Sequence, residues 1–184
     1  MKKSYDYFKT LKNLSLILSN TISFIDDSKS VNKEYLCFLA LKNELSENLI
    51  NEFVAPIERN DIYKLSFCLN EEFSSIFKLC NFLDLSDADY SDSVRQIGDL
   101  FYRQDAVFDI RNLLKTPDKS LKFISNELLN CKKVKKSIIV ETHNNLCSQN
   151  RTLIKYIIGS SGIDVVSSVE KTYNEVCAVL INNS

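Results

Sequence analysis

Four aspartates that lie close together in the sequence are the first candidates for metal chemistry. They are Asp84, Asp87, Asp89 and Asp92. Carboxylate oxygens are hard ligands that suit Ca²⁺. The stretch nevertheless lacks the central glycine and the closing glutamate of an EF-hand loop. We therefore interpret it as a solvated connection between two helices whose aspartates act as helix caps.

Histidine is a frequent general acid or base in enzymes, and this chain has one, His143. Glu141 and Ser148 are close to it in the sequence, but no turn of the G-x-S-x-G type is present. Three glycines in the whole chain are too few for a loop that cradles phosphate groups. We predict no catalytic and no cofactor-binding residue, and interpret His143 as a polar residue near a helix end.

One basic run has the chemistry to contact phosphate, an acidic partner or lipid headgroups. It consists of Lys132, Lys133, Lys135 and Lys136. The whole chain has 23 basic and 24 acidic residues and a net charge of −1. A charge so near zero argues against nonspecific binding to nucleic acid. We therefore interpret the run as an exposed helix face and predict no nucleic-acid partner.

The six cysteines form no C-x-x-C pair, the common spacing of zinc ligands. They are Cys37, Cys68, Cys80, Cys131, Cys147 and Cys177. Most lie beside apolar residues at helical spacing, which indicates reduced thiols in a core. No apolar run approaches the roughly 18 residues of a membrane span, and the charged N-terminal stretch is not typical of a signal peptide. We expect a cytoplasmic protein.

Apolar residues recur every three or four positions along most of the chain, which predicts long helices and no sheet. The expected helices span about 4–26, 32–52, the Pro56 turn to 83, 91–115, 116–145 and 152–181. Thr116 followed by Pro117 is typical of a helix start. Gly159 and Gly162 should kink or split the last helix, because each glycine weakens a helix by about 1 kcal/mol.

These elements predict an all-α fold, an antiparallel helical bundle in one domain over residues 1–184. Three helices precede the run of aspartates and three follow it. We therefore predict an internal pseudo-repeat of about 4–84 and 91–182.

The turn after the second expected helix resembles a known family. Its sequence is Phe53-Val54-Ala55-Pro56-Ile57-Glu58-Arg59-Asn60-Asp61-Ile62. It is similar to the Phe-(Ile/Val)-x-Pro-Ile-Glu-Arg-x-Asp-Ile turn of the PhoU-like phosphate-transport regulators, in the branch that accompanies Pit-type permeases. Asp6-Tyr7-Phe8 is similar to the start of that family. The resemblance implies two three-helix units packed together.

Metal-binding members of that family use pairs of carboxylates at i and i+4 on facing helices, which together make a cage of oxygen ligands. This chain departs from that pattern. The corresponding positions are Tyr35 and Leu39, Asn70 and Ser74, the basic stretch 130–134, and the stretch 163–167. Glu71 and Glu72 lie close to Asn70 and Ser74, and only Asp164 is acidic in the stretch 163–167. We therefore expect a PhoU-like scaffold without intact metal clusters, and no metal site.

The resemblance implies a non-enzymatic regulatory protein of inorganic phosphate transport that acts by protein–protein contact. Its partner would be a Pit-type phosphate permease or another regulatory protein, and it would reach the membrane only through that partner. Two alternatives stay open. One is a metal-binding bundle with oxidase or hydrolase activity that uses Glu71, Glu72 and Asp164. The other is a degenerate scaffold that acts only by forming homo-oligomers.

Overall fold

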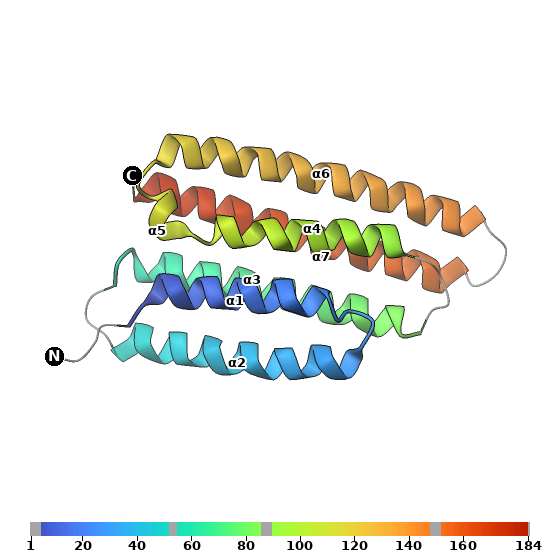
Figure 1. The fold of residues 1–184 in the computed structure, drawn as a ribbon, viewed down its shortest axis with the longest axis horizontal. Helices are drawn as coiled ribbons and strands as arrows, with labels where there is room; N and C mark the ends of the chain where they lie inside the picture. The colour runs from blue at the N-terminus through green and yellow to red at the C-terminus, as the bar shows by residue number, and fades with distance from the viewer. Residues whose placement is uncertain (1–4, 52–54, 86–89, 148–151, 184) are drawn as a thin grey trace.

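The computed structural model describes residues 5–51, 55–85, 90–147 and 152–183, and these form an antiparallel all-α bundle. The helices are α1 (Tyr7–Ile22), α2 (Ser28–Asn51), α3 (Arg59–Leu83), α4 (Ser91–Val107), α5 (Ile110–Leu113), α6 (Pro117–Cys147) and α7 (Thr152–Asn182). The six long helices alternate in direction, as the colours of Figure 1 show. No strand occurs in the described residues, and the predicted fold class is confirmed.

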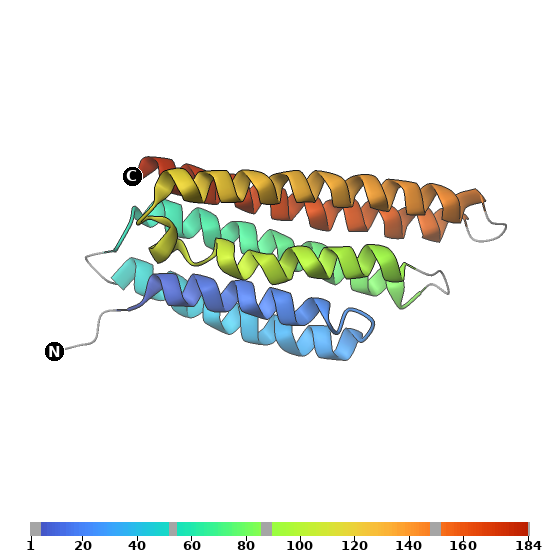
Figure 2. The same cartoon turned by 45° about the horizontal axis from the view of Figure 1, so that its top comes forward.

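The long helices form two groups of three. α1, α2 and α3 contact one another, and so do α4, α6 and α7. The groups meet where α3 packs along α7 and α1 packs along α4, which leaves α2 and α6 on the outside (Figures 1 and 2). This arrangement fits the predicted two three-helix units. The internal sequence repeat stays a prediction.

One apolar core runs through both groups of helices. In α1, the predicted stripe of Leu11, Leu14 and Leu18 is fully buried. In α3, the stripe continues through residues such as Leu69 and Phe73, which are also fully buried. Residues at this spacing share one face of a helix, and fully burying one such side chain stabilises the fold by about 1.5–3 kcal/mol.

The predicted fourth helix, residues 91–115, is wrong in one respect. The chain leaves the helix after Val107 and starts the short helix α5 at Ile110. Phe108 and Ile110 are 1% and 0% exposed. Residues two apart do not share a face of a continuous helix, so an unbroken helix would not bury both side chains. The break allows Phe108 and Ile110 to enter the core together.

The predicted boundaries of the first two helices are also corrected. α1 ends at Ile22, about four residues early, and α2 begins at Ser28, about four residues early. The early start of α2 follows from Asp27, whose carboxylate accepts hydrogen bonds from Lys29 N (3.1 Å) and Ser30 Oγ (2.6 Å). A carboxylate at this position satisfies the free N–H groups of a first helical turn.

α7 is one continuous helix, so the predicted split at Gly159 and Gly162 is wrong. A Cβ atom built on Gly159 would lie 2.6 Å from Thr142 Cγ2 on α6 and closer still to Thr142 Oγ1. The glycine therefore allows α6 and α7 to approach closely. The packing against α6 keeps α7 helical despite the low helix propensity of glycine.

Both helix starts predicted from proline are confirmed. α6 begins at Pro117, and α3 begins at Arg59 shortly after Pro56. Phe53 and Val54, which open the family-like turn, lie outside the described residues.

Candidate functional site

A buried polar group lies where three helices meet at the centre of the bundle. Glu72 of α3 is 0% exposed, and its Oε2 accepts a hydrogen bond from Gln104 Nε2 of α4 at 2.7 Å. The hydroxyl of Thr172 on α7 lies near this carboxyl and lowers its pKa, while it donates to the Ser168 carbonyl of its own helix at 3.1 Å. Because α3 belongs to one three-helix group and α4 and α7 to the other, these three side chains join the two groups.

Burial governs the charge of this group. Desolvation raises the pKa of the Glu72 carboxyl to about 7, although the hydrogen bond from Gln104 and the nearby hydroxyl of Thr172 lower it. Glu72 Oε1 and Gln104 Oε1 have no hydrogen-bond partner among the described residues. A proton on Glu72 would turn one of its oxygens into a donor. The neutral acid therefore fits this environment better than the carboxylate does.

The structure does not bring the three acidic metal candidates together. Glu71 lies beside Glu72 in sequence but is partly exposed and pairs with Lys171 of α7. Asp164 is exposed on α7, seven residues before Lys171, which is about 10 Å along a helix. Among the described residues, no group of three or more His, Cys, Asp or Glu side chains is placed to share a metal ion.

The positions that the resemblance assigns to acidic pairs make packing and hydrogen-bond contacts instead. Tyr35 of α2 lies against Phe73 of α3, with ring centroids 5.1 Å apart. Asn70 Oδ1 accepts a hydrogen bond from Lys42 Nζ at 3.0 Å, and Ser74 Oγ donates to the carbonyl of Asn70. The contacts of Tyr35 and Lys42 join α2 to α3, and that of Ser74 lies within α3.

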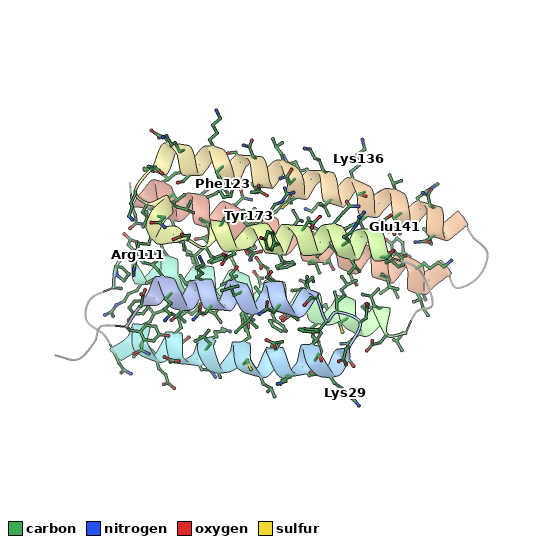
Figure 3. The ribbon with its side chains drawn as sticks, in the orientation of Figure 1. Lys29, Arg111, Phe123, Lys136, Glu141 and Tyr173 are labelled. Carbon is green, nitrogen blue, oxygen red and sulfur yellow. The ribbon has the colours of Figure 1, made fainter. Side chains whose placement is uncertain are left out.

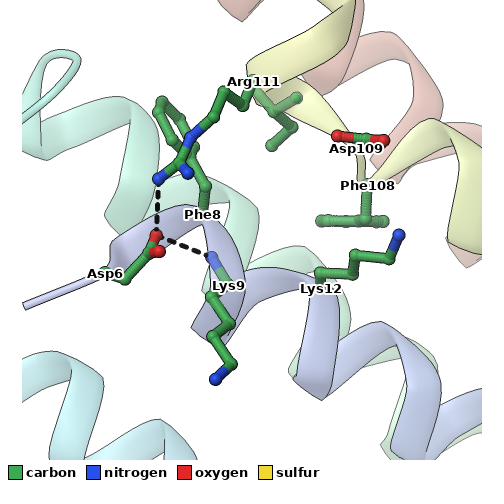
Figure 4. A pocket seen from close by; sticks show the side chains of 8 residues that line it. Asp6, Phe8, Lys9, Lys12, Phe108, Asp109 and Arg111 are labelled. Atoms are coloured by element: carbon green, nitrogen blue, oxygen red, sulfur yellow. Dashed lines mark hydrogen bonds and ion pairs between the residues drawn. The ribbon is translucent and has the colours of Figure 1, made fainter.

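A hollow of about 260 Å³ opens between the start of α1 and α5 (Figure 4). Arg111 Nη2 donates to Asp6 Oδ1 at 2.9 Å, and its guanidinium lies 5.6 Å from the centre of the Phe8 ring. Asp6 also accepts a hydrogen bond from Lys9 N at 3.1 Å and so caps α1. Because Asp6 already neutralises Arg111, we interpret this cluster as a structural contact between α1 and α5.

Among the described residues near His143, Glu141 bonds to a different helix. His143 is exposed near the end of α6, beside an apolar groove of about 260 Å³ between α6 and α7. Glu141 Oε2 accepts hydrogen bonds from the backbone N, at 3.1 Å, and the hydroxyl of Ser93 in the first turn of α4. Its carboxylate is therefore committed to the N-terminus of α4. Ser148 lies outside the described residues.

The run of aspartates is described only in part. Asp84 is exposed at the end of α3, and Asp92 pairs with Arg95 within the first turns of α4 at 2.9 Å. Asp87 and Asp89 lie outside the described residues. The described members lie at helix ends, but the expected side-chain caps are not found there: the N-cap of α4 is Tyr90, and Asp84 closes α3 through its backbone N–H.

Most of the expected core thiols are where the sequence placed them. Cys68, Cys80 and Cys131 are buried, and burial raises the pKa of their thiols to about 11, 11 and 12. Cys177 is half-buried, and Cys37 is exposed on α2, so the prediction of a core position is wrong for Cys37. These five thiols are free. The side chain of Cys147 lies outside the described part of the chain.

The sequence analysis missed Gln104 and Thr172, although the sequence contains a signal for both residues. Glu72 follows Leu69 by three residues and lies on the buried stripe of α3. Gln104 and Thr172 occupy the same kind of position on α4 and α7. A polar residue on an apolar stripe indicates a buried polar contact, because a buried polar group needs a partner.

Comparisons with known proteins give no family assignment. The chain matches no protein-family model, and no curated protein sequence is significantly similar to it. Within the described residues, none of the helices combines the length and the apolar character that crossing a membrane requires.

Proposed function

We propose that this protein is a non-enzymatic, cytoplasmic regulator of inorganic phosphate transport, related to the PhoU-like accessory proteins, and that it acts by protein–protein contact. The partner is a Pit-type phosphate permease or another regulatory protein. The proposal joins the family-like turn around Pro56 to the two packed three-helix groups of the bundle.

The single observation that carries a contact function is the exposure of apolar side chains on the two outer helices. On α2, Leu36 and Ile50 are 67% and 78% exposed. On α6, Leu129, Ile139 and Val140 are each more than half exposed. On each of these two helices, apolar side chains are exposed on the outward face, as they are at sites that bind other molecules.

The acidic side chains that were candidates for catalysis or metal binding are bonded to other residues of the bundle. This also favours a function in protein–protein contact over catalysis. Glu72 bonds to Gln104, Glu141 bonds to Ser93, and Glu71 pairs with Lys171. Each of these contacts joins two different helices. The metal-binding alternative gains no support, because Glu71, Glu72 and Asp164 do not converge. A stoichiometric transition metal in elemental analysis of the purified protein would favour that alternative instead.

A pull-down experiment tests the proposed partner. The tagged full-length protein is incubated with detergent-solubilised membranes that contain a Pit-type permease encoded beside it. The proposal predicts that the permease is retained and that a variant with charges on the outer helices, Leu36→Glu with Leu129→Glu, retains less. Failure of the wild-type protein to retain the permease or any other regulator of phosphate transport would contradict the proposal.

The second candidate function, a homo-oligomeric scaffold, is favoured by one specific observation. Leu36 and Ile50 lie about four helical turns apart on α2, and both side chains are more than two thirds exposed. Light scattering with size-exclusion chromatography tests this candidate. It predicts a dimer or larger species for the wild-type protein and a monomer for Leu36→Glu with Ile50→Glu. A wild-type monomer at all concentrations would exclude it.

A further inference from the structure

Positive charge is concentrated on the outer face of α6. This helix contains six of the 23 basic residues but only three of the 24 acidic ones. Two of its acids turn inward: Glu127 is 7% exposed and lies 3.8 Å from Arg103 of α4, and Glu141 contacts Ser93. Figure 3 shows Lys136 pointing away from the bundle and Glu141 lying between α6 and α4.

The lysines on this face make no ion pair with a described residue. Lys122, Lys132, Lys133 and Lys136 are all exposed. Lys135 differs, because it turns toward α7 and pairs with Glu170. The protein therefore neutralises the lysine that faces a neighbouring helix and leaves the outward ones uncompensated. An uncompensated cluster of this size attracts a surface of opposite charge.

Apolar side chains alternate with these lysines on the same face. Leu129, Ile139 and Val140 are 54%, 55% and 51% exposed. Leu129 precedes Lys132 by three residues, and Ile139 and Val140 follow Lys136 by three and four, which places them on one side of the helix. Ile139 also borders the groove at the end of α6 and α7, where Tyr156 of α7 is 59% exposed. Lysines with interspersed apolar and aromatic side chains are typical of helices that lie in a membrane interface.

We propose that the outer face of α6 binds directly to the surface of an anionic lipid bilayer. The lysines contact the phosphate and carboxylate groups of the headgroups, while Leu129, Ile139 and Val140 enter the boundary between headgroups and acyl chains. The proposal stands on α6 alone and does not depend on a role in phosphate transport. It adds a direct membrane contact to the contact made through a protein partner.

Two features favour a bilayer over other occupants. The groove between α6 and α7, of about 260 Å³, is smaller than most pockets that enclose a small molecule. This volume favours contact with lipids that stay in the bilayer over enclosure of a single small molecule. A nucleic acid would match the lysines but not the apolar side chains between them.

The expected strength follows from the number of lysines. Each lysine close to an anionic leaflet strengthens binding about fivefold at low salt. Replacing three of them should therefore weaken binding by about a hundredfold, and reversing their charge should weaken it further. The attraction should also fall steeply with salt, because the Debye length shortens from about 10 Å at 0.1 M to about 3 Å at 1 M.

Vesicle sedimentation with the full-length protein tests the proposal. One set of vesicles contains phosphatidylcholine alone. The other contains phosphatidylcholine with about 30–40% phosphatidylglycerol, which makes the leaflet anionic. The test variant is Lys132→Glu, Lys133→Glu, Lys136→Glu. The matched control is Lys29→Glu, Lys33→Glu, Lys78→Glu, which changes the charge equally at exposed sites on α2 and α3. Circular dichroism checks that both variants are folded.

The proposal predicts that the wild-type protein and the control sediment with anionic but not neutral vesicles, and that the α6 variant stays in solution. Ile139→Ser with Val140→Ser should retain the dependence on anionic lipid but bind several-fold more weakly. Three results would overturn the proposal: no binding of the wild-type protein to anionic vesicles, equal loss in the α6 variant and the control, or binding to an acidic polypeptide such as polyglutamate without binding to vesicles.

Discussion

Glu72 is the residue whose environment departs most from that of a typical carboxylate. It is fully buried at the junction of the two three-helix groups, with Gln104 as a hydrogen-bond donor and no described cation in contact. Its neighbours include the thiols of Cys68 and Cys131 and the hydroxyl of Tyr173, whose pKa values a negative charge on Glu72 would raise. All three are neutral near pH 7, because burial raises their pKa values. A proton on Glu72 therefore stabilises the folded state.

The pH dependence of stability has a definite sign at this site. The pKa of Glu72 rises from 4.5 to about 7 on folding, so the folded state holds a proton that the unfolded state releases between these values. The contribution of Glu72 is fully present below pH 4.5 and is lost as the pH rises through 7, by about 3 kcal/mol in total.

Glu72→Gln should remove this loss, because glutamine is neutral at every pH and still accepts from Gln104. We expect the variant to be more stable than wild type by about 1–3 kcal/mol at pH 8 and nearly equal to it at pH 5. Urea unfolding at the two pH values measures the difference. Glu71→Gln is the matched control, and an equal gain in that variant at pH 8 would contradict the assignment to Glu72.

The two glycines of α7 should respond in opposite ways to alanine. A Cβ at Gly159 would clash with Thr142, whereas at Gly162 the nearest atoms lie 3.6 Å away, an ordinary contact. Gly159→Ala should therefore destabilise by about 1–3 kcal/mol, and Gly162→Ala should stabilise by up to about 1 kcal/mol through helix propensity. Thermal unfolding measures both variants. Similar effects at the two sites would show that α6 and α7 do not approach closely at Gly159.

At the scale of elements, the helix starts marked by proline could be predicted from single residues, and the break between α4 and α5 could not. Pro117 predicts the start of α6 because a proline fits the first helical position. The break between α4 and α5 depends on the burial of Phe108 and Ile110 against other helices, and periodicity within one segment does not contain that information. Likewise, Glu72 was recognised as a candidate, but its pairing with Gln104 depends on how α3 packs against α4.

The contact between α1 and α5 should depend on the charge of Asp6 as well as on its side-chain oxygen, which caps α1. Asp6→Ala loses both the cap of α1 and the contact with Arg111, which should cost about 1–2 kcal/mol. Asp6→Asn keeps a cap acceptor and loses the ion pair, and should cost less than half as much. Chemical denaturation compares the two. An equal cost in both variants would mean that the ion pair, not the cap, carries the stability of this contact.

At the scale of the whole molecule, the bundle separates what it buries from what it presents. The interface of α1 and α3 with α4 and α7 holds the core and its polar centre, while the outer helices α2 and α6 present apolar and basic side chains. The fold class was predictable because apolar periodicity is a property of each helix alone. The outward lysines of α6 were predicted as an exposed face, but the lack of ion-pair partners for them among the described residues appears only when the neighbouring helices are in place.

We propose that the protein acts on phosphate transport through contact and not through catalysis. Phosphate uptake by cells that lack the protein tests it most directly, with the wild-type protein and Glu72→Gln reintroduced separately. We predict that uptake changes when the protein is deleted and that both proteins restore it to the same rate, because the buried carboxyl serves the fold. Uptake that is identical with and without the protein would contradict the account.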